Sequence, residues 1–456
     1  MNNKKICILI PLMISGCANI PILEQPSKTN IISVQLDKNK GSDWWVELND
    51  EQLNGILEDV LKNNSDLKIM KLSLEKSIIS YDLSDIKQYA TVDLNSSFEK
   101  EKLSGKGMTP PPYAGSIINM GQIGFHGAYA IDYMNKNNLE VEQKNKELLG
   151  VNYQIDNVKL AVQGQVVQLY FYYQYLLKTE ELIKEKQSIQ NEIEKSYIKG
   201  INLGKILPSD LLSIESNGIK INNEMESVLK NKELTISSLI SLSGNKNISI
   251  KQQSKIMLFS EQEPVRNIGI NQLKNRPDLK FYLTNIEAQQ RKISSLKADF
   301  YPSITMTGDI GLQKVGFANM FNRNAQFWNI GPSISLPIFD SGRIADNYKF
   351  AGVELKEFIE KYNQKVFLSV KEVNDAIYSE KSSYQILKNQ IAITDNVEKI
   401  NKSNLNLFKN GKQTKIFTLN AKMQLVNEQQ SLLSSRLNYI DAKIDRIQSV
   451  GGNNGK

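Results

Sequence analysis

The sequence predicts an α+β membrane protein in which a few amphipathic strands lie between very long helices, the whole arrangement occurring twice. Three observations lead to this fold class: four segments that alternate apolar and polar residues, long stretches almost free of Pro and Gly, and two halves that match each other. Of the 456 residues, 40% are hydrophobic and 23% are charged, and the mean hydropathy is negative. This composition excludes a bundle of membrane-spanning helices.

The N-terminus has the pattern of an export signal. Lys4 and Lys5 precede an apolar run from Ile6 to Ile14 that is too short to span a bilayer, and small residues follow it. Residues 14–17 resemble a bacterial lipobox, so we expect residues 1–16 to be a lipoprotein signal peptide and Cys17 to become the lipidated first residue. An ordinary signal peptide with an incidental Cys is the alternative.

The two halves match at a constant offset. Residues 63–67 (NNSDL) align with 275–279 (NRPDL), and residues 89–94 align with 301–306 at the same distance of 212 positions. A fixed offset at this period indicates a two-fold internal duplication rather than a solenoid of short units.

Four segments alternate apolar and polar side chains with a period of two. They are predicted at about 89–99, 122–133, 300–312 and 327–338. One apolar and one polar face per strand is typical of a transmembrane β-barrel, although a soluble sheet with one buried face would look the same. The export signal favours the membrane interpretation.

Four strands cannot close a barrel, because the smallest known barrels have about eight. Open sheet edges in lipid would leave unpaired backbone groups at a cost of several kcal/mol each. Several copies of the chain must therefore combine, and three copies would give twelve strands.

The remaining periodic segments predict long helices at about 135–197, 208–242, 341–408 and 416–449. The first would be on the order of 95 Å long at ~1.5 Å per residue. Apolar residues of the last helix recur at spacings of three and four, which is typical of coiled-coil packing. The stripe consists of Leu419, Met423, Val426, Leu433, Leu437, Ile440, Ile444 and Ile447, with Gln430 as its one polar member.

These elements organise the chain into two repeats, 51–244 and 266–450, and each repeat is expected to begin with one helix before its first strand. The polar segment 245–265 joins them, and we expect it to pack as an equatorial linker around the bundle. Residues 17–50 are expected to be an extended lipidated segment and residues 451–456 a flexible tail.

Glycines mark the reversals between the long helices, because glycine reaches positive φ without strain. Gly411 occupies the second turn, whereas either Gly200 or Gly204 could serve the first.

The composition offers few histidines and cysteines for catalysis or metal binding. His126 is the one histidine, and Cys7 and Cys17 are the two cysteines, which excludes zinc fingers and multi-histidine metal sites. His126 falls on the polar face of its strand, where we expect a wetted interior residue and not a ligand. The formal charge of +7 is modest and does not indicate nucleic-acid binding. We expect neither an enzyme nor a cofactor.

Taken in order and spacing, several motifs resemble the outer-membrane factor (TolC-like) family, and most closely its lipoprotein branch of efflux-pump channels. They are Asp43-Trp44-Trp45, Asn64-Ser65-Asp66-Leu67, Ile131-Asp132-Tyr133, Asn275 to Leu279, Phe300 to Ile304, Trp328 to Gly331 and Leu336 to Arg343. The resemblance implies a homotrimer whose twelve-stranded barrel continues into a coiled-coil periplasmic tunnel. It also implies a passive exit duct for drugs or other small toxic compounds, anchored in the bacterial cell outer membrane.

In that family the helical turns meet a periplasmic adaptor protein, which in turn recruits an inner-membrane pump. The candidates for adaptor contact here are Gly200, Ile201, Leu203, Gly204, Gly411, Lys412 and Thr414. For each of them a purely structural role in the turn is the alternative.

The resemblance also implies a channel gate. The family's apolar and acidic gate positions in the second half fall on Ile416 and Asn420, and a basic one falls on Met423. An amide thus replaces the usual acid. Asp210 matches an acidic position in the first half, and three copies of it would attract cations.

A different class of function stays open from the residues alone. The long helical stripes and the lipid anchor would also suit a structural or adhesive coiled-coil lipoprotein of the outer membrane without channel activity.

Overall fold

A computed structural model describes residues 20–23, 44–48, 50–245, 248, 250–252, 263–264, 270–316 and 321–452. The described chain divides into two compact units. The first is built from Leu74–Val151 and Tyr282–Tyr362, and the second from Asn152–Phe281, Asn363–Lys456 and part of Ile32–Ser73. The signal peptide, most of segment 17–50 and most of the 245–265 linker lie outside the described residues.

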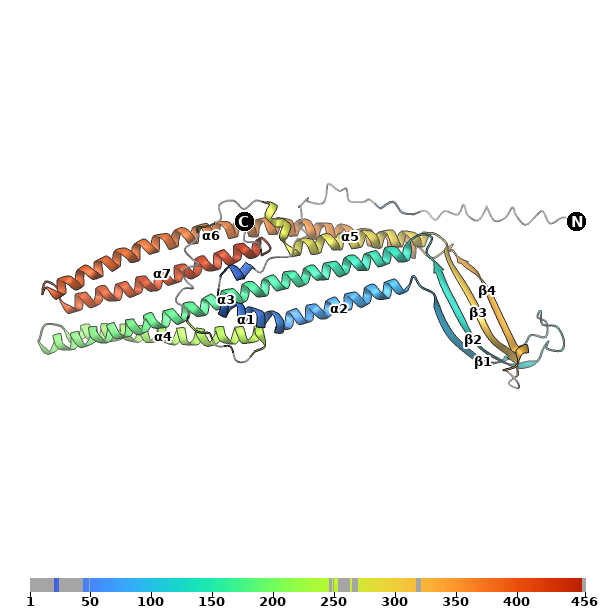
Figure 1. Ribbon diagram of the computed structural model, residues 1–456, viewed down its shortest axis with the longest axis horizontal. Coiled ribbons are helices and arrows are strands. Elements are labelled where there is room, and N and C mark those ends of the chain that lie inside the picture. The colour runs from blue at the N-terminus through green and yellow to red at the C-terminus, as the bar shows by residue number, and fades with distance from the viewer. Residues whose placement is uncertain are drawn as a thin grey trace. The chain divides into compact units, whose positions relative to one another are not determined.

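A four-stranded antiparallel sheet forms one part of the first unit (Figure 1). Its strands are β1 (Thr91–Lys102), β2 (Ile117–Ile131), β3 (Ser303–Val315) and β4 (Gln326–Ser335), in the order β1-β2-β3-β4. The two halves of the sequence thus meet where β2 pairs with β3. Among the described residues β1 and β4 each pair with one strand only, so both edges of the sheet are open.

The register places apolar and polar residues on opposite faces. Val92, Phe125, Ile310 and Trp328 lie on one face and are all exposed in the single chain. The other face carries Asp, Asn, Ser, Thr and Gln side chains together with several glycines. A sheet with so many apolar side chains on one face would be unfavourable in water, whereas lipid would cover that face favourably.

The strand ends differ from those predicted from the alternation. β1 ends later than predicted, at Lys102, and β2 begins earlier, at Ile117. The backbone pairing between them extends into residues whose side chains no longer alternate clearly. β4 ends at Ser335, before the predicted end at residue 338.

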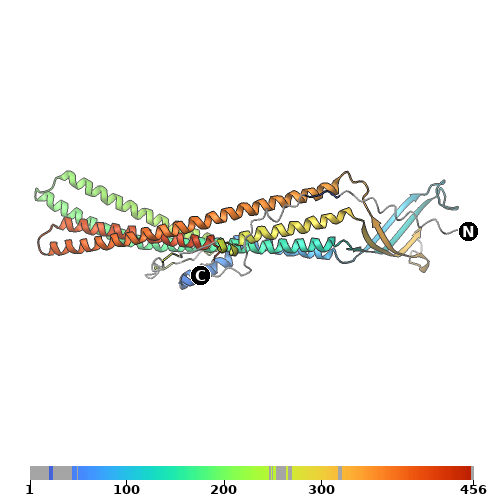
Figure 2. The ribbon, with the colours of Figure 1, turned by 90° about the horizontal axis from the view of Figure 1, so that it is seen from above.

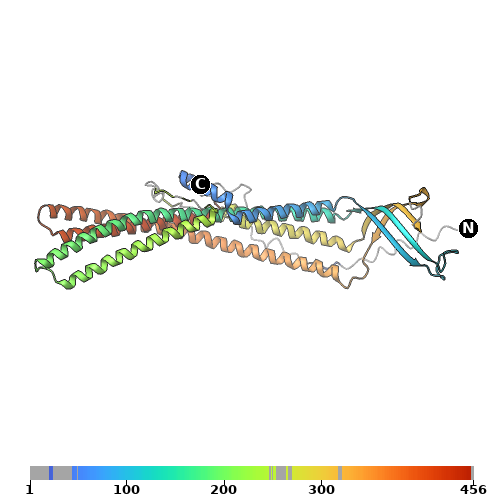
Figure 3. The same cartoon turned by 90° about the horizontal axis from the view of Figure 1, so that it is seen from below.

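Two helical hairpins dominate the second unit (Figure 3). The first joins α3 (Lys136–Asn202) to α4 (Pro208–Ser243), and the second joins α6 (Arg343–Lys409) to α7 (Lys415–Ser449). The predicted heptad stripe of α7 is buried, except that Met423 and Gln430 are only partly so. No helix among the described residues is apolar over a long enough stretch to cross a bilayer.

Shorter helices precede each strand pair. The first half has α1 (Glu51–Asn63) and α2 (Ser65–Ile86), where the sequence suggested one helix. The break lies at Asn64, whose side chain accepts a hydrogen bond from the Leu67 N–H at 3.1 Å. The second half has a short 3-10 helix, Ile270–Asn275, followed by α5 (Pro277–Lys297).

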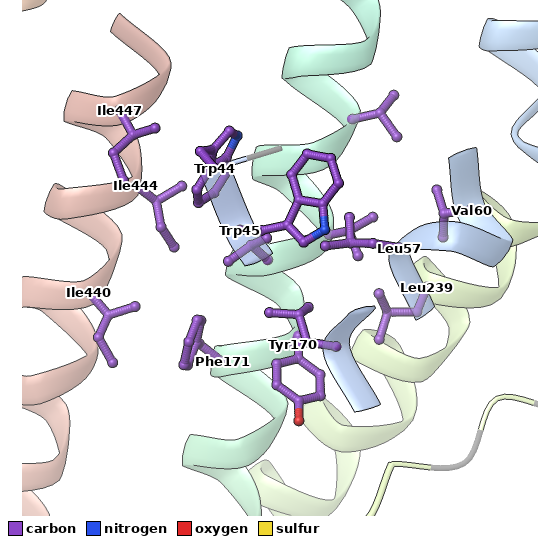
Figure 4. Packing of buried hydrophobic residues seen from close by; sticks show 14 of the residues in the cluster. Trp44, Trp45, Leu57, Val60, Tyr170, Phe171, Leu239, Ile440, Ile444 and Ile447 are labelled. Carbon is purple, nitrogen blue, oxygen red and sulfur yellow. The ribbon is translucent and has the colours of Figure 1, made fainter. Parts of the chain in front are cut away.

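The main hydrophobic core lies within the second unit (Figure 4). Trp44 and Trp45 pack with Tyr170 and Phe171 of α3, and Figure 4 shows Trp44 close to Ile444 of α7.

Asp50 supports this core by capping α1, since its carboxylate accepts hydrogen bonds from two N–H groups of the first turn. It also accepts one from the Tyr170 hydroxyl at 2.8 Å, and burial together with Asp50 raises the pKa of Tyr170.

In each half, a side chain just before one helix donates a hydrogen bond to a carbonyl at the end of another helix. The two side chains, Asn64 and Arg276, lie at matching positions of the two halves. Asn64 Nδ2 donates to the Leu242 carbonyl at 3.0 Å, at the end of α4. Arg276 Nη1 donates to the Ser449 carbonyl at 2.7 Å, at the end of α7. Burial would raise the pKa of Asp278, but the adjacent Arg276 guanidinium outweighs it and lowers that pKa.

Two glycines on the polar face offer a matched test of the sheet. A Cβ on Gly311 would lie 2.3 Å from the Ile123 carbonyl oxygen and 2.6 Å from Cα of Gly124, whereas one on Gly331 would meet nothing within 4 Å. Because backbone cannot yield to such an overlap, Gly311→Ala should disrupt the pairing of β2 with β3. We expect little folded protein from Gly311→Ala and a normal yield from Gly331→Ala, measured by resistance to protease. Equal yields would contradict the predicted clash.

Candidate partner-binding turns and channel gate

The turn between α3 and α4 closes on a glycine in the left-handed region. Gly204 has a φ of +65°, its N–H donates to the Ile201 carbonyl, and the Lys205 N–H donates to the Gly200 carbonyl at 2.9 Å. This pair of bonds is the Schellman motif of helix ends. Gly200 itself lies within α3, and a Cβ there would come 2.4 Å from Cδ1 of Ile206. Gly204 is therefore the turn glycine, and Gly200 is a position of close packing.

The turn between α6 and α7 has the same local structure. Gly411 has a φ of +68°, its N–H donates to Phe408, and the Lys412 N–H donates to Leu407, both at 2.9 Å. α4 and α7 each begin four residues after their glycine. The two turns are thus equivalent at a spacing of 207 residues, and they lie at the same end of the second unit (Figures 1 and 2).

Apolar side chains are exposed beside both turns. Leu203 and Leu207 are 59% and 67% exposed at the first turn, and Phe417 is 48% exposed at the second. Thr414, an expected contact residue, instead caps α7, because its hydroxyl accepts a hydrogen bond from the Phe417 N–H at 3.3 Å. Ile201 is half-buried, and Lys412 is exposed. Exposed apolar side chains grouped at one end of a helical unit are suited to a protein partner.

The three expected gate residues lie on two different helices. Asp210 is exposed in the first turn of α4, whereas Ile416 is half-buried and Asn420 is exposed on α7. Counted from the equivalent glycines, Asp210 corresponds to Phe417 and not to Asn420. The two halves therefore present different side chains at matching heights.

A buried lysine explains the one polar member of the α7 stripe. Lys186 of α3 is only 6% exposed, and its Nζ lies 2.5 Å from a carboxylate oxygen of Glu224 on α4 and 3.3 Å from Oε1 of Gln430 on α7. It thereby links three helices at one point. Sequence reasoning singled out Gln430 but had no signal for its partner, 244 residues away.

A buried ion pair joins α6 to α7. Arg446 Nε lies 2.7 Å from Glu380 Oε2, and both side chains are 2% exposed. Burial raises the pKa of Glu380, against the opposing effect of Arg446 and then of Lys443. Glu380 lies within the apolar stripe of its helix, three residues after the half-buried Ile377 and seven before Leu387. An acidic residue within an apolar stripe indicates a buried charge, and this sign of the ion pair is visible in the sequence, although the sequence analysis did not use it.

Two carboxylates lie one turn apart on α7. Burial, reinforced by Asp445, raises the pKa of Asp441 to about 6. Burial also raises the pKa of Asp445, although a hydrogen bond of 2.8 Å from Gln168 opposes this effect. Asp441 Oδ1 is buried without a hydrogen bond to the described residues.

His126 lies on the polar face of the sheet, as predicted. Its Nδ1 lies 2.7 Å from Oδ1 of Asp309 on the neighbouring strand, so an imidazole–carboxylate pair forms across β2 and β3. No group of three or more metal-ligating side chains occurs among the described residues. Cys17 lies outside the described residues, so its predicted lipidation stays a prediction.

Comparisons with known proteins point to one family. A family model described as "Outer membrane efflux protein" matches residues 271–452. The chain is 22% identical to the solvent efflux pump outer membrane protein SrpC of Pseudomonas putida, over 99% of this chain and 98% of SrpC. It is 21% identical to SilC of Salmonella typhimurium, described as a probable outer membrane lipoprotein, over 98% of both chains.

The fold has solved counterparts. The crystal structure of CusC matches with a TM-score of 0.80 at 19% identity, covering 96% of this chain and all of CusC. The outer-membrane channel OprN matches with a TM-score of 0.80 at 16% identity, covering 96% of this chain and 99% of OprN. The chain therefore shares its fold with these proteins over nearly its whole length.

The raised pKa of Asp441 predicts a pH-dependent stability. Below about pH 4 this carboxyl is protonated whether the chain is folded or not; between pH 4 and 6 the folded state retains the proton, and above pH 6 it must hold a poorly solvated charge. Stability is therefore lost as pH rises through this window. Asp441→Asn should raise the free energy of unfolding by roughly 1–2 kcal/mol at pH 7.5, after allowance for partial exposure.

The same substitution should bring no gain at pH 4. Thermal unfolding followed by circular dichroism measures both values, and Asp395→Asn, at an exposed position of α6, is the control. A gain that is equal at both pH values would rule out the carboxyl as its cause.

Proposed function

This chain belongs to the outer-membrane factor family, so it is an outer-membrane efflux channel and not an enzyme, and we propose that it serves as the trimeric exit duct of a tripartite pump. A duct needs no cofactor, because the pump supplies the energy. The compounds carried would be drugs or other small toxic molecules.

The observation that carries the proposal is the open sheet with one apolar and one polar face. Backbone groups at an open edge are costly in lipid, and four strands are too few to close on themselves. Three copies, with β1 of each pairing with β4 of the next, would close a twelve-stranded barrel. Its apolar face would meet lipid and its polar face would line the pore.

The internal two-fold repeat is part of the same proposal. The equivalent Schellman turns at Gly204 and Gly411 support it, as do the matching ties made by Asn64 and Arg276. With this repeat, three copies contribute six helical hairpins. We expect these hairpins to form the wall of the periplasmic tunnel.

The turns at the end of the second unit are the proposed site of adaptor contact. The candidates for direct contact are Ile201, Leu203, Gly204, Gly411 and Lys412, while Gly200 and Thr414 would act by shaping the turns. The adaptor would in turn connect the duct to an inner-membrane pump. The exposed Leu203 and Leu207 favour an apolar contact.

A lipid on Cys17 would add an anchor to the outer membrane. The lipobox-like sequence before Cys17 supports this, and the full-length similarity to SilC agrees with it. The proposed gate consists of Asp210, Ile416 and Asn420 near the same turns. Three copies of Asp210 would form an acidic ring.

Leu203→Asp tests the contact with the adaptor. A charge in the centre of an apolar contact should weaken binding by roughly tenfold or more. Cells that carry only this variant should become as sensitive to exported drugs and dyes as cells that lack the gene. Asn223→Asp, at an exposed position in the middle of α4, should leave resistance intact. Full resistance in the Leu203→Asp strain, at normal protein levels, would exclude Leu203 from the contact.

Asp210→Ala tests the gate. Removal of three carboxylates from a narrow ring should lower both the single-channel conductance for K⁺ and the preference for cations in planar bilayers. Asp395→Ala, on α6, serves as the control. If Asp210→Ala matches the parent protein in both quantities, Asp210 does not line the constriction.

A further inference from the structure

The lysines of the four strands all lie on the apolar face of the sheet, at the end away from the helices (Figure 1). Lys100 and Lys102 belong to β1, and Lys314 belongs to β3. The register places them on the face that carries Phe98 and Trp328. No other described strand position is Lys or Arg. The lysine charge of the sheet is therefore gathered at one end of the face that we expect to meet lipid.

The lysines begin where the apolar positions of β1 end. From Val92 to Phe98, three of the four positions that β1 presents on this face are apolar, and Lys100 follows next. The distance from Val92 to Lys100 is ~26 Å along the strand, or roughly 20 Å of height at the usual tilt. Because the apolar band of a barrel is about 25 Å tall, Lys100 would lie near its edge, where headgroups begin. The long stem of a lysine reaches them from there.

The sheet itself does not neutralise these charges. Its apolar face has no Asp or Glu at any described strand position. Glu99 and Glu101 alternate with the lysines along β1 and therefore lie on the opposite face. Lys100 and Lys102 are exposed, and neither forms an ion pair with another residue of the described chain. An anion that approaches from the lipid side would thus meet lysines without competing carboxylates.

The two loops beside the lysines are basic as well. Residues 103–116 and 316–325 contain Lys106 and Arg323 but no Asp or Glu. Both of these side chains are exposed. Met108 and Phe321 of the same loops are 103% and 84% exposed, so apolar side chains stand close in the chain to the cations. Cations next to apolar groups are suited to a membrane interface with anionic lipid.

We propose that Lys100, Lys102 and Lys314, together called the basic band, bind the phosphate groups of an anionic lipid in the outward leaflet of the outer membrane. The inference rests on the proposed function, because this end of the strands faces outward only if the helices extend into the periplasm. Ammonium groups form charge-assisted hydrogen bonds with phosphate oxygens. The band would thereby fix the height of the barrel in the membrane.

A lipid suits this place better than a soluble anion does. The basic band is continuous with the exposed apolar side chains of the same face, such as Phe98 and Trp328. A phosphorylated glycolipid supplies phosphates for the lysines and acyl chains for these apolar side chains at the same time. Inorganic phosphate would supply only the charge.

Binding of a fluorescent lipid A, the phosphorylated glycolipid of such membranes, tests the basic band with the full-length protein in detergent micelles. The parent protein should bind lipid A with two phosphates roughly fivefold or more tightly than the same lipid without phosphates, because each lysine near a charged lipid surface adds to the attraction. Lys100→Gln/Lys102→Gln should remove most of this preference. Lys100→Arg/Lys102→Arg should retain it, which shows that the charge and not the fold of β1 is responsible.

Glu99→Gln/Glu101→Gln, on the opposite face of the same strand, is the matched control and should not weaken binding. Inorganic phosphate in large excess should not displace the lipid, and displacement would assign the lysines to soluble anions instead. An equal affinity of the parent protein for the two lipids would overturn the basic band. A preference that is unchanged in Lys100→Gln/Lys102→Gln would overturn it as well.

Planar bilayers with the same preparations test the proposed function separately. A parent protein that forms no pores would overturn the duct. A parent protein that forms pores but shows no preference for the phosphorylated lipid would overturn the lipid contact alone.

Discussion

The two open edges of the four-stranded sheet are the constraint on which the remaining features depend. In a bilayer the outward backbone groups of β1 and β4 need partners, and the described residues of one chain offer none. In the trimer that we propose, neighbouring copies of the chain would supply these partners. Because each strand pair is connected directly to long helices, an assembly that closes the sheet also brings helices of different copies together. The exposed apolar side chains along α4 and α6, such as Ile219 and Phe367, agree with shared helical surfaces.

Most of the fold could be predicted from periodicity, because each strand and each long helix repeats its apolar residues over many positions. The ends of elements could not. β1 continues through Glu99 to Lys102, where pairing with β2 depends on the backbone and not on side-chain type. The break between α1 and α2 depends on one cap, Asn64, whose role becomes visible only with its partner at the end of α4.

The candidate sites, like the fold, could be predicted from the sequence only in part. Turn glycines are visible in the sequence, yet the choice between Gly200 and Gly204 required the hydrogen bonds of the turn. Gln430 and Glu380 stand out locally as polar residues within apolar stripes, but their partners Lys186 and Arg446 are far away in the chain, so no local pattern reveals the contacts. His126 was placed on the correct face, but the pairing of β2 with β3 was needed to bring Asp309 beside it. The register between β2 and β3, which the sequence alone does not reveal, was therefore needed to identify this pair.

The number of chains in the assembled protein tests the central claim most directly. Native mass spectrometry of the full-length protein, extracted from outer membranes in mild detergent, measures this number without reference to any substrate or partner. A twelve-stranded barrel requires three copies, and we expect a mass of three mature chains that falls to one after heating in denaturant. A single chain as the stable species in the extract would contradict the account, because four strands would then have to remain open in lipid.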